Sequence, residues 1–308
     1  MQYIVLQNAR GFVGESFDAF TPQTSTFADG EVSVNLEGLD YKSPKSFAIV
    51  ASVFGQNSLF EILFTISTIA RNSTKPIHLL IPYLGYARQD REISPNAPIS
   101  AKIIADLICS QAVTTISVME MHSQQVQGFF TKPCFNISLK GYFSDFKKIL
   151  SAKLADKQIT LDQFQNFSVV VAPDVGAAKN ARQVANNLGV PLAIIEKFRY
   201  GPGESEVIGI TGDVKGKICY IFDDIIDSAG TLCNAAQLLK DSGAIQICAF
   251  AAHGIFSGKA QERIENSEFL AVWVSKSIFH TNLTSKKIGY IEVFPFVKDE
   301  FEKRIENF

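Results

Sequence analysis

Short apolar runs rich in β-branched residues alternate with helical patterns along most of this 308-residue chain. Strands are expected at 3–7, 47–53, 77–82, 115–119, 169–172, 192–195, 218–222, 247–251 and 271–274. Apolar stripes with i, i+3, i+4 spacing predict helices around 59–66, 103–108, 177–188 and 232–239. Strands that alternate with helices in this way predict an α/β fold of mainly parallel sheets flanked by helices.

The length of the chain favours two domains over one hydrophobic core. The region 139–166 is polar, charged and weakly patterned, so the junction is expected there. We predict an N-terminal domain over 1–143 and a C-terminal domain over 144–292. The last segment, 293–308, is expected to pack back on the first domain.

Composition excludes several classes of protein. The formal net charge is -2, which argues against a nucleic-acid-binding surface. No apolar stretch approaches 18 residues and no signal peptide is visible, so no membrane partner is expected. Five widely spaced cysteines form no ligand motif, which argues against disulfides and structural zinc and favours a cytoplasmic location.

The segment from Asp223 to Thr231 follows an expected strand and precedes an expected helix. Ligands of open parallel sheets bind at such loops. Its small residues can present amide N–H groups to an anion at a helix N-terminus. The paired carboxylates of Asp223 and Asp224 suit sugar hydroxyls, so the segment indicates a sugar-phosphate site. The alternative is that Asp227 or Ser228 is only an N-cap and the acid pair a solvated turn.

A second loop of this kind runs over 172–179. It could hold a diphosphate group, with Asp174 reaching a metal ion. An Asp-capped helix start explains the same residues equally well. The sequence contains neither a GxxxxGK[ST] nor a GxGxxG motif, so any nucleotide is bound by other means.

The string DDIIDSAGT at 223–231 resembles the PRPP-binding signature of phosphoribosyltransferases and ribose-phosphate diphosphokinases (PRPP synthetases). Further strings point to the synthetases: FADGE at 27–31, PYLGYARQDR at 82–91, APISAK at 97–102 and MHS at 121–123. The resemblance runs nearly end to end. It implies two phosphoribosyltransferase-like domains and transfer of the β,γ-diphosphoryl group of ATP to the C1 hydroxyl of ribose 5-phosphate, giving PRPP and AMP for nucleotide biosynthesis.

The resemblance also implies roles for residues of the second domain. Asp223 and Asp224 would bind the ribose hydroxyls. The 5-phosphate would be held by Asp227, Ser228, Ala229, Gly230 and Thr231. The diphosphate would be held by Asp174, Val175, Gly176, Ala177 and Ala178. Lys197 and Arg199 match the basic pair that opens the family's catalytic loop, and Arg199 would also contact ribose 5-phosphate. Without the resemblance, both would pass as ordinary surface residues.

In the first domain, Arg88 and Gln89 match the family's ATP-contacting pair. A neighbouring subunit would complete the adenine site with Phe27, Asp29, Gly30 and Glu31. A homo-oligomer, a hexamer or a smaller even assembly, is therefore implied. Asp29-Gly30 is also a type I′ hairpin signal. His122 and Asp174 resemble metal-associated residues, which implies Mg²⁺, although a lone histidine after a strand is more often a packed residue.

The sequence departs from the family pattern at several positions. Thr26 and Asn96 stand where many members have arginine, so the resemblance does not decide whether this chain shares the allosteric regulation of regulated members. Glu120 replaces an aspartate near His122, which could shift the metal geometry. Two alternatives stay open: a non-catalytic partner subunit, and a phosphoribosyltransferase that consumes PRPP. The ATP-side strings disfavour the transferase.

Overall fold

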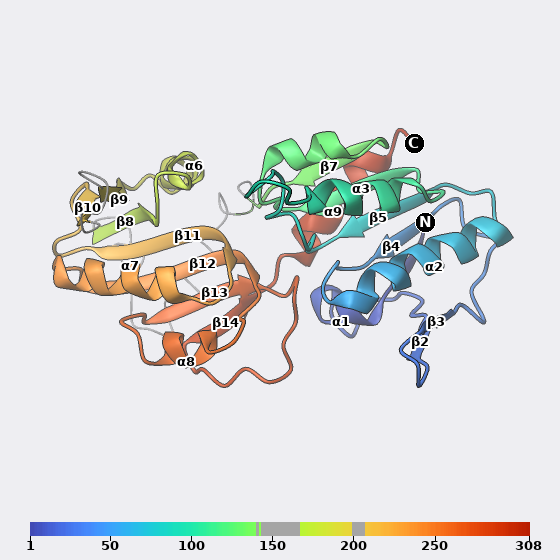
Figure 1. The fold of residues 1–308 in the computed structure, drawn as a ribbon, viewed down its shortest axis with the longest axis horizontal. Helices are drawn as coiled ribbons and strands as arrows, with labels where there is room; N and C mark the ends of the chain where they lie inside the picture. Colours follow the sequence, from blue (N-terminus) through green and yellow to red (C-terminus); the bar gives the residue numbers. More distant parts are fainter. Residues whose placement is uncertain (140–141, 143–166, 199–206) are drawn as a thin grey trace. The chain divides into compact units, whose positions relative to one another are not determined.

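The computed structural model describes residues 1–139, 142, 167–198 and 207–308. The chain forms two compact α/β units, coloured along the sequence in Figure 1. The first unit consists of Met1–Ser138, Lys276–Phe279 and Glu292–Phe308. The second consists of Leu139–Ser275 and His280–Ile291. The first unit is therefore built from three separate parts of the chain.

The first unit is organised around a sheet of five parallel strands in the order β1-β4-β5-β6-β7. These strands are β1 (Gln2–Val5), β4 (Phe47–Val50), β5 (Ile77–Ile81), β6 (Thr115–Met119) and β7 (Cys134–Ile137). Every residue of β4, β5 and β6 is buried, as expected for parallel strands covered on both faces. The accompanying helices are α1 (Gln7–Val13), α2 (Gln56–Asn72), α3 (Ser100–Cys109), the 3₁₀ helix η1 (Gln124–Phe129) and α9 (Phe294–Ile305).

Helix α9 lies against β6 and β7, although it comes from the far end of the sequence. Its buried residues, Phe294, Val297, Phe301 and Ile305, recur every three or four positions and so form one face. Burying each of these side chains contributes about 1.5–3 kcal/mol. Tyr3 Oη also donates a hydrogen bond to Glu302 Oε1 (2.9 Å), which connects β1 with α9.

The second unit contains a sheet of seven strands in the order β10-β9-β8-β11-β12-β13-β14. Its strands are β8 (Ser168–Ala172), β9 (Leu192–Phe198), β10 (Val207–Thr211), β11 (Ile218–Ile226), β12 (Gln246–Gly254), β13 (Ala271–Ser275) and β14 (Ile288–Ile291). All pairs are parallel except β9 with β10. The helices are α6 (Ala178–Leu188), α7 (Gly230–Asp241) and α8 (Ala260–Glu265). The predicted α/β architecture is confirmed.

A separate antiparallel hairpin joins β2 (Gln23–Thr26) to β3 (Val32–Asn35). The predicted type I′ turn is wrong, because that turn needs positive φ at both central residues and only Gly30 has it, at 93°. Instead, Gly30 N donates to Phe27 O (2.9 Å) and Phe27 N donates to Glu31 O (2.8 Å). The loop thus has three residues and ends on a left-handed glycine, the geometry of a turn followed by a bulge.

Within the part of the chain that the structure describes, no helix is both long enough and apolar enough to cross a membrane. All five cysteines are free thiols.

Candidate active site

The turn between β11 and α7 is the most distinctive feature of the second unit. Strand β11 ends at Ile226, and α7 begins at Gly230. The N-cap position is held by Ala229, in the left-handed conformation with φ 60° and ψ 5°. A methyl side chain cannot accept a hydrogen bond from the helix, so the interpretation of Asp227 or Ser228 as the N-cap is wrong. The N-cap residue therefore leaves the first amides of α7 without a side-chain cap, and amides of this kind can bind an anion.

The two residues before Ala229 are held by the segment that follows β12. Ser257 Oγ donates a hydrogen bond to Asp227 Oδ1. Arg263 Nη1 donates to the backbone oxygen of Ser228 at 2.7 Å. Both partners lie about 30 residues further along the sequence, so the turn is tied to a distant part of the chain.

The acid pair lies inside a strand and not in a loop. Strand β11 continues to Ile226, four residues beyond its predicted end, because it pairs with β12 along its whole length. Its pairing with β8 stops at Ile221. Asp223 and Asp224 are both half-buried on this extension. The solvated-turn interpretation of these residues is therefore wrong.

Burial, followed by the nearby charge of Asp224, raises the pKa of Asp223 to about 8. Asp174, which follows the neighbouring strand β8, contributes to the same rise. An ionised carboxylate is disfavoured where water is excluded and other negative charges are close. Three carboxylates therefore converge at the carboxyl ends of two adjacent strands, and a ligand that brings hydrogen-bond donors or positive charge would relieve their repulsion.

The loop after β8 carries the second predicted anion site. Asp174 is exposed, and its Oδ1 accepts a hydrogen bond from Ala177 N at 2.8 Å. Helix α6 begins one residue later, at Ala178. The structure thus gives Asp174 the side-chain to backbone hydrogen bond expected of an aspartate that begins a helix. Asp174 also interacts electrostatically with Asp223, so it lies near the acid pair.

Lys197 lies near the carboxyl end of β9, where its backbone is paired with Ile208 of β10. Arg199, the second predicted catalytic residue, lies outside the described residues.

The residues of the first unit that were predicted to contact the nucleotide and its metal ion follow β5 and β6. Arg88 and Gln89 are exposed. Ser100 Oγ at the start of α3 donates to Gln89 Oε1 (2.6 Å), and Ala101 N donates to Gln89 O (3.2 Å). Hydrogen bonds therefore connect the YARQD and APISAK segments in the folded chain. His122 is exposed and follows β6.

The hairpin tip presents the remaining predicted residues to solvent. The Phe27 side chain is 59% exposed, which is unusual for an aromatic ring. Asp29 Oδ1 accepts a hydrogen bond from Glu31 N (3.1 Å), so the carboxylate stabilises the turn. Asp29, Gly30 and Glu31 are all exposed.

The predicted residues fall into two groups, one in each unit. Among the described residues, no group of three or more His, Cys, Asp or Glu side chains is arranged to hold a metal ion by itself. Neither Ser257 nor Arg263 was predicted as a site residue, because no local pattern could connect them with a turn about 30 residues earlier in the sequence.

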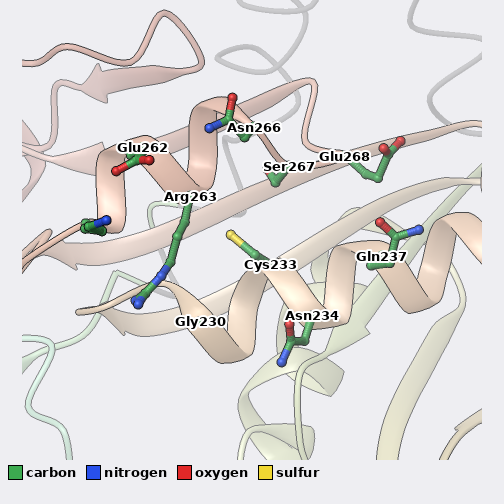
Figure 2. A pocket seen from close by; sticks show the side chains of 10 residues that line it. Gly230, Cys233, Asn234, Gln237, Glu262, Arg263, Asn266, Ser267 and Glu268 are labelled. Carbon is green, nitrogen blue, oxygen red and sulfur yellow. The ribbon is translucent and has the colours of Figure 1, made fainter.

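A pocket of about 500 Å³ opens between α7 and α8, next to this turn (Figure 2). Gly230 and Arg263 both contribute to its lining. The other side chains shown are mostly polar, and Cys233 points between the two helices. Burial raises the pKa of the Cys233 thiol, and the nearby Arg263 charge partly opposes that rise.

Fold and site together define an α/β protein in which a helix start without a side-chain cap lies beside a pair of half-buried acids. Comparison with known proteins is more specific. Residues 16–111 match the N-terminal domain of ribose phosphate pyrophosphokinase. Residues 198–307 match the phosphoribosyl synthetase-associated domain.

Ribose-phosphate pyrophosphokinases of two bacteria are similar over most of their length. The protein of Caulobacter vibrioides is 39% identical over 290 residues, covering 92% of this chain and 88% of the relative. That of Thermosipho africanus is 40% identical over 265 residues, covering 86% and 80%. The phosphoribosylpyrophosphate synthetase of Mycobacterium smegmatis has the same fold over the full length of both chains, with a TM-score of 0.81 and 26% identity. The chain belongs to the ribose-phosphate pyrophosphokinase family.

Proposed function

We propose that this chain catalyses the reaction for which its family is named, the transfer of a diphosphate group from ATP to ribose 5-phosphate. The products are PRPP and AMP, and PRPP supplies nucleotide biosynthesis. The observation that carries the proposal is the start of α7, which has no side-chain cap, close to the half-buried acids Asp223 and Asp224. A phosphate and a polyhydroxy sugar on one small molecule satisfy both features at once.

In this proposal the second unit binds the sugar. The turn from Asp227 to Thr231 holds the 5-phosphate through its amides and the dipole of α7. Asp223 and Asp224 accept hydrogen bonds from the ribose hydroxyls. The loop over 174–178 holds the diphosphate while it moves, because it follows β8, the strand next to β11.

The carboxylates at this edge of the sheet fit a magnesium ion that arrives with its substrate. Mg²⁺ is usually held by one or two carboxylates together with phosphate oxygens and water. Asp174 and the acid pair supply such a partial set. Burial, followed by the nearby charges of Asp224 and Asp174, raises the pKa of Asp223, and a bound cation would oppose that rise. The bound ion would neutralise part of the polyphosphate charge. His122 is proposed as a metal-associated residue on the ATP side.

The first unit is proposed to bind ATP. Arg88 and Gln89 contact the nucleotide, and the bonds from Ser100 and Ala101 hold Gln89 in place. The segment with Phe27, Asp29, Gly30 and Glu31 completes the adenine site of a neighbouring copy, so the protein is a homo-oligomer, a hexamer or a smaller even assembly. The exposure of Phe27 supports this role, since an aromatic ring that projects from a hairpin can stack on a base.

The reaction requires in-line attack of the C1 hydroxyl on the β-phosphorus of ATP. Both substrates are anionic, so the protein contributes mainly by positioning them and neutralising charge. Lys197 and Arg199 supply positive charge to the transferring group. A preorganised donor of this kind contributes about 10²–10³-fold in rate.

The test is product identity. The protein is incubated with Mg²⁺, ATP and ribose 5-phosphate, and the nucleotides are separated by chromatography. AMP that forms only when the sugar phosphate is present supports the proposal, and ribose without phosphate serves as the matched control. ADP instead of AMP would indicate ordinary phosphoryl transfer and refute it. No nucleotide change would favour a non-catalytic partner subunit.

A further inference from the structure

One charged side chain from outside the phosphate-binding turn contacts its backbone. Arg263 belongs to α8, and its Nη1 donates a hydrogen bond to Ser228 O at 2.7 Å. Figure 2 shows this side chain reaching from α8 toward the start of α7 at Gly230. Arg263 is itself exposed, so the bond adds little to the hydrophobic core.

This bond fixes the direction of one peptide group. The carbonyl and the N–H of a planar trans peptide point in opposite directions. Because the Ser228 carbonyl is held toward α8, the N–H of the same peptide, which belongs to Ala229, points away from α8. A rotated peptide would direct the Ser228 carbonyl to that side instead, where its partial negative charge would repel an anion.

The backbone at this point needs such a restraint. Ala229 is a non-glycine residue in the left-handed region, a conformation that costs roughly 1–2 kcal/mol. Conformations of this kind persist only where the surroundings enforce them, and they gather at ligand-binding sites. The guanidinium of Arg263 supplies a charge-assisted bond, which is stronger than a neutral one.

We propose that Arg263 is a positioning residue for the phosphate-binding turn: by holding the Ser228 carbonyl, it directs the Ala229 N–H to the 5-phosphate of the bound sugar. The inference rests on the proposed function, because it assumes that the turn binds that phosphate. Arg263 acts through the backbone and does not contact the substrate. Its loss should therefore weaken sugar-phosphate binding without affecting ATP.

The experiment compares Arg263→Gln and Arg263→Lys with the wild type and with Lys259→Gln. Lys259 is the matched control, since it lies one turn earlier beside the same pocket and donates no hydrogen bond to the turn. AMP formation is measured with each substrate varied in turn. Ribose 5-phosphate binding is measured by calorimetry, and the melting temperature by differential scanning fluorimetry.

For Arg263→Gln we expect the KM and Kd for ribose 5-phosphate to rise about 10-fold, the worth of one charge-assisted bond. The KM for ATP should stay within about 2-fold, with the melting temperature unchanged. Arg263→Lys should be intermediate because its ammonium retains a donor. Lys259→Gln should match the wild type.

An unchanged KM and Kd for ribose 5-phosphate in Arg263→Gln would overturn the inference. Equal losses for both substrates, or a lower melting temperature, would also overturn it, because they would show a general structural role. Wild-type protein that binds ribose 5-phosphate but makes no AMP would refute the proposed function alone, and the Kd values would still decide the role of Arg263. Absence of binding by the wild type would refute both.

Discussion

Replacing Asp223 with asparagine should make the protein more stable and less active. The folded protein holds the pKa of this carboxyl at about 8, against an ordinary value of 3.8. Below about pH 4 the carboxyl of Asp223 is protonated in both the folded and the unfolded chain, so its ionisation does not lower the stability of the fold. As the pH rises toward 8, the unfolded chain loses the proton while the folded chain retains it, and the stability of the wild type falls through this window.

The magnitude follows from 1.36 kcal/mol per pKa unit. Multiplied by the difference between the pH and the ordinary pKa of 3.8, this value lowers the free energy of unfolding by about 4 kcal/mol at pH 7 and about 2 kcal/mol at pH 5. Asparagine is neutral at every pH but must still be buried, so we expect Asp223→Asn to recover about half of this cost. That is about 2 kcal/mol at pH 7, or roughly 4–8 °C in melting temperature.

The assay is differential scanning calorimetry of wild type and Asp223→Asn between pH 5 and pH 8. The gap in melting temperature should widen as the pH rises. AMP formation should fall about 10-fold or more, because asparagine replaces one of the two carboxyl oxygens that would accept hydrogen bonds from the sugar with an NH₂ group. Asp241→Asn, at the exposed end of α7, is the matched control for replacing an aspartate of the same unit. A gap that is constant with pH, or a less stable variant, would refute the electrostatic reasoning.

Three further predictions concern other parts of the site. Lys197→Ala should lower kcat by about 10²-fold with the KM for ATP nearly intact, and near-normal turnover would contradict its role. Asp227→Ala should mainly raise the KM for ribose 5-phosphate in steady-state assays, and a selective loss of ATP binding would mean that the two substrate sites have been exchanged. Gly85→Ala should destabilise the first unit by about 1–3 kcal/mol in urea unfolding, because a Cβ at this position would lie 2.4 Å from Val53 O. An unaltered unfolding midpoint would show that the loop can move away.

Buried strands were the most predictable part of this fold. All nine predicted strands occur. A continuous apolar run between turn residues is typical of a strand that is buried on both faces of a parallel sheet. The strands that were missed include β7, β10 and β14. Of these, β7 and β14 have half-buried positions and mixed composition. β7, β10 and β14 are edge strands, and each forms by pairing with a strand that is already in the sheet. A local sequence pattern carries no information about that pairing.

The site was predictable where chemistry and sequence coincide. The stretch from Asp223 to Thr231 could be identified because its acids and small residues are contiguous. The end of β11 could not be predicted, because its last residues are held in the strand by pairing with β12. The hydrogen bond from Arg263 to Ser228 spans 35 positions and has no local signal. The hairpin was correctly expected, but its turn type depended on the φ of Asp29, which the dipeptide alone does not fix.

The return of α9 to the first sheet has a consequence for the order in which the protein matures on the ribosome. Residues 292–308 are translated after every residue of the second unit, so the unit that begins first is completed last. Until then, the surface of β6 and β7 that α9 covers stays open to water and to other nascent chains. A chain shortened to residues 1–291 should therefore bind a fluorescent hydrophobic dye and bind to a chaperone, and added peptide 292–308 should reverse both effects. If the shortened chain behaves like the full one, α9 is dispensable for closing that surface.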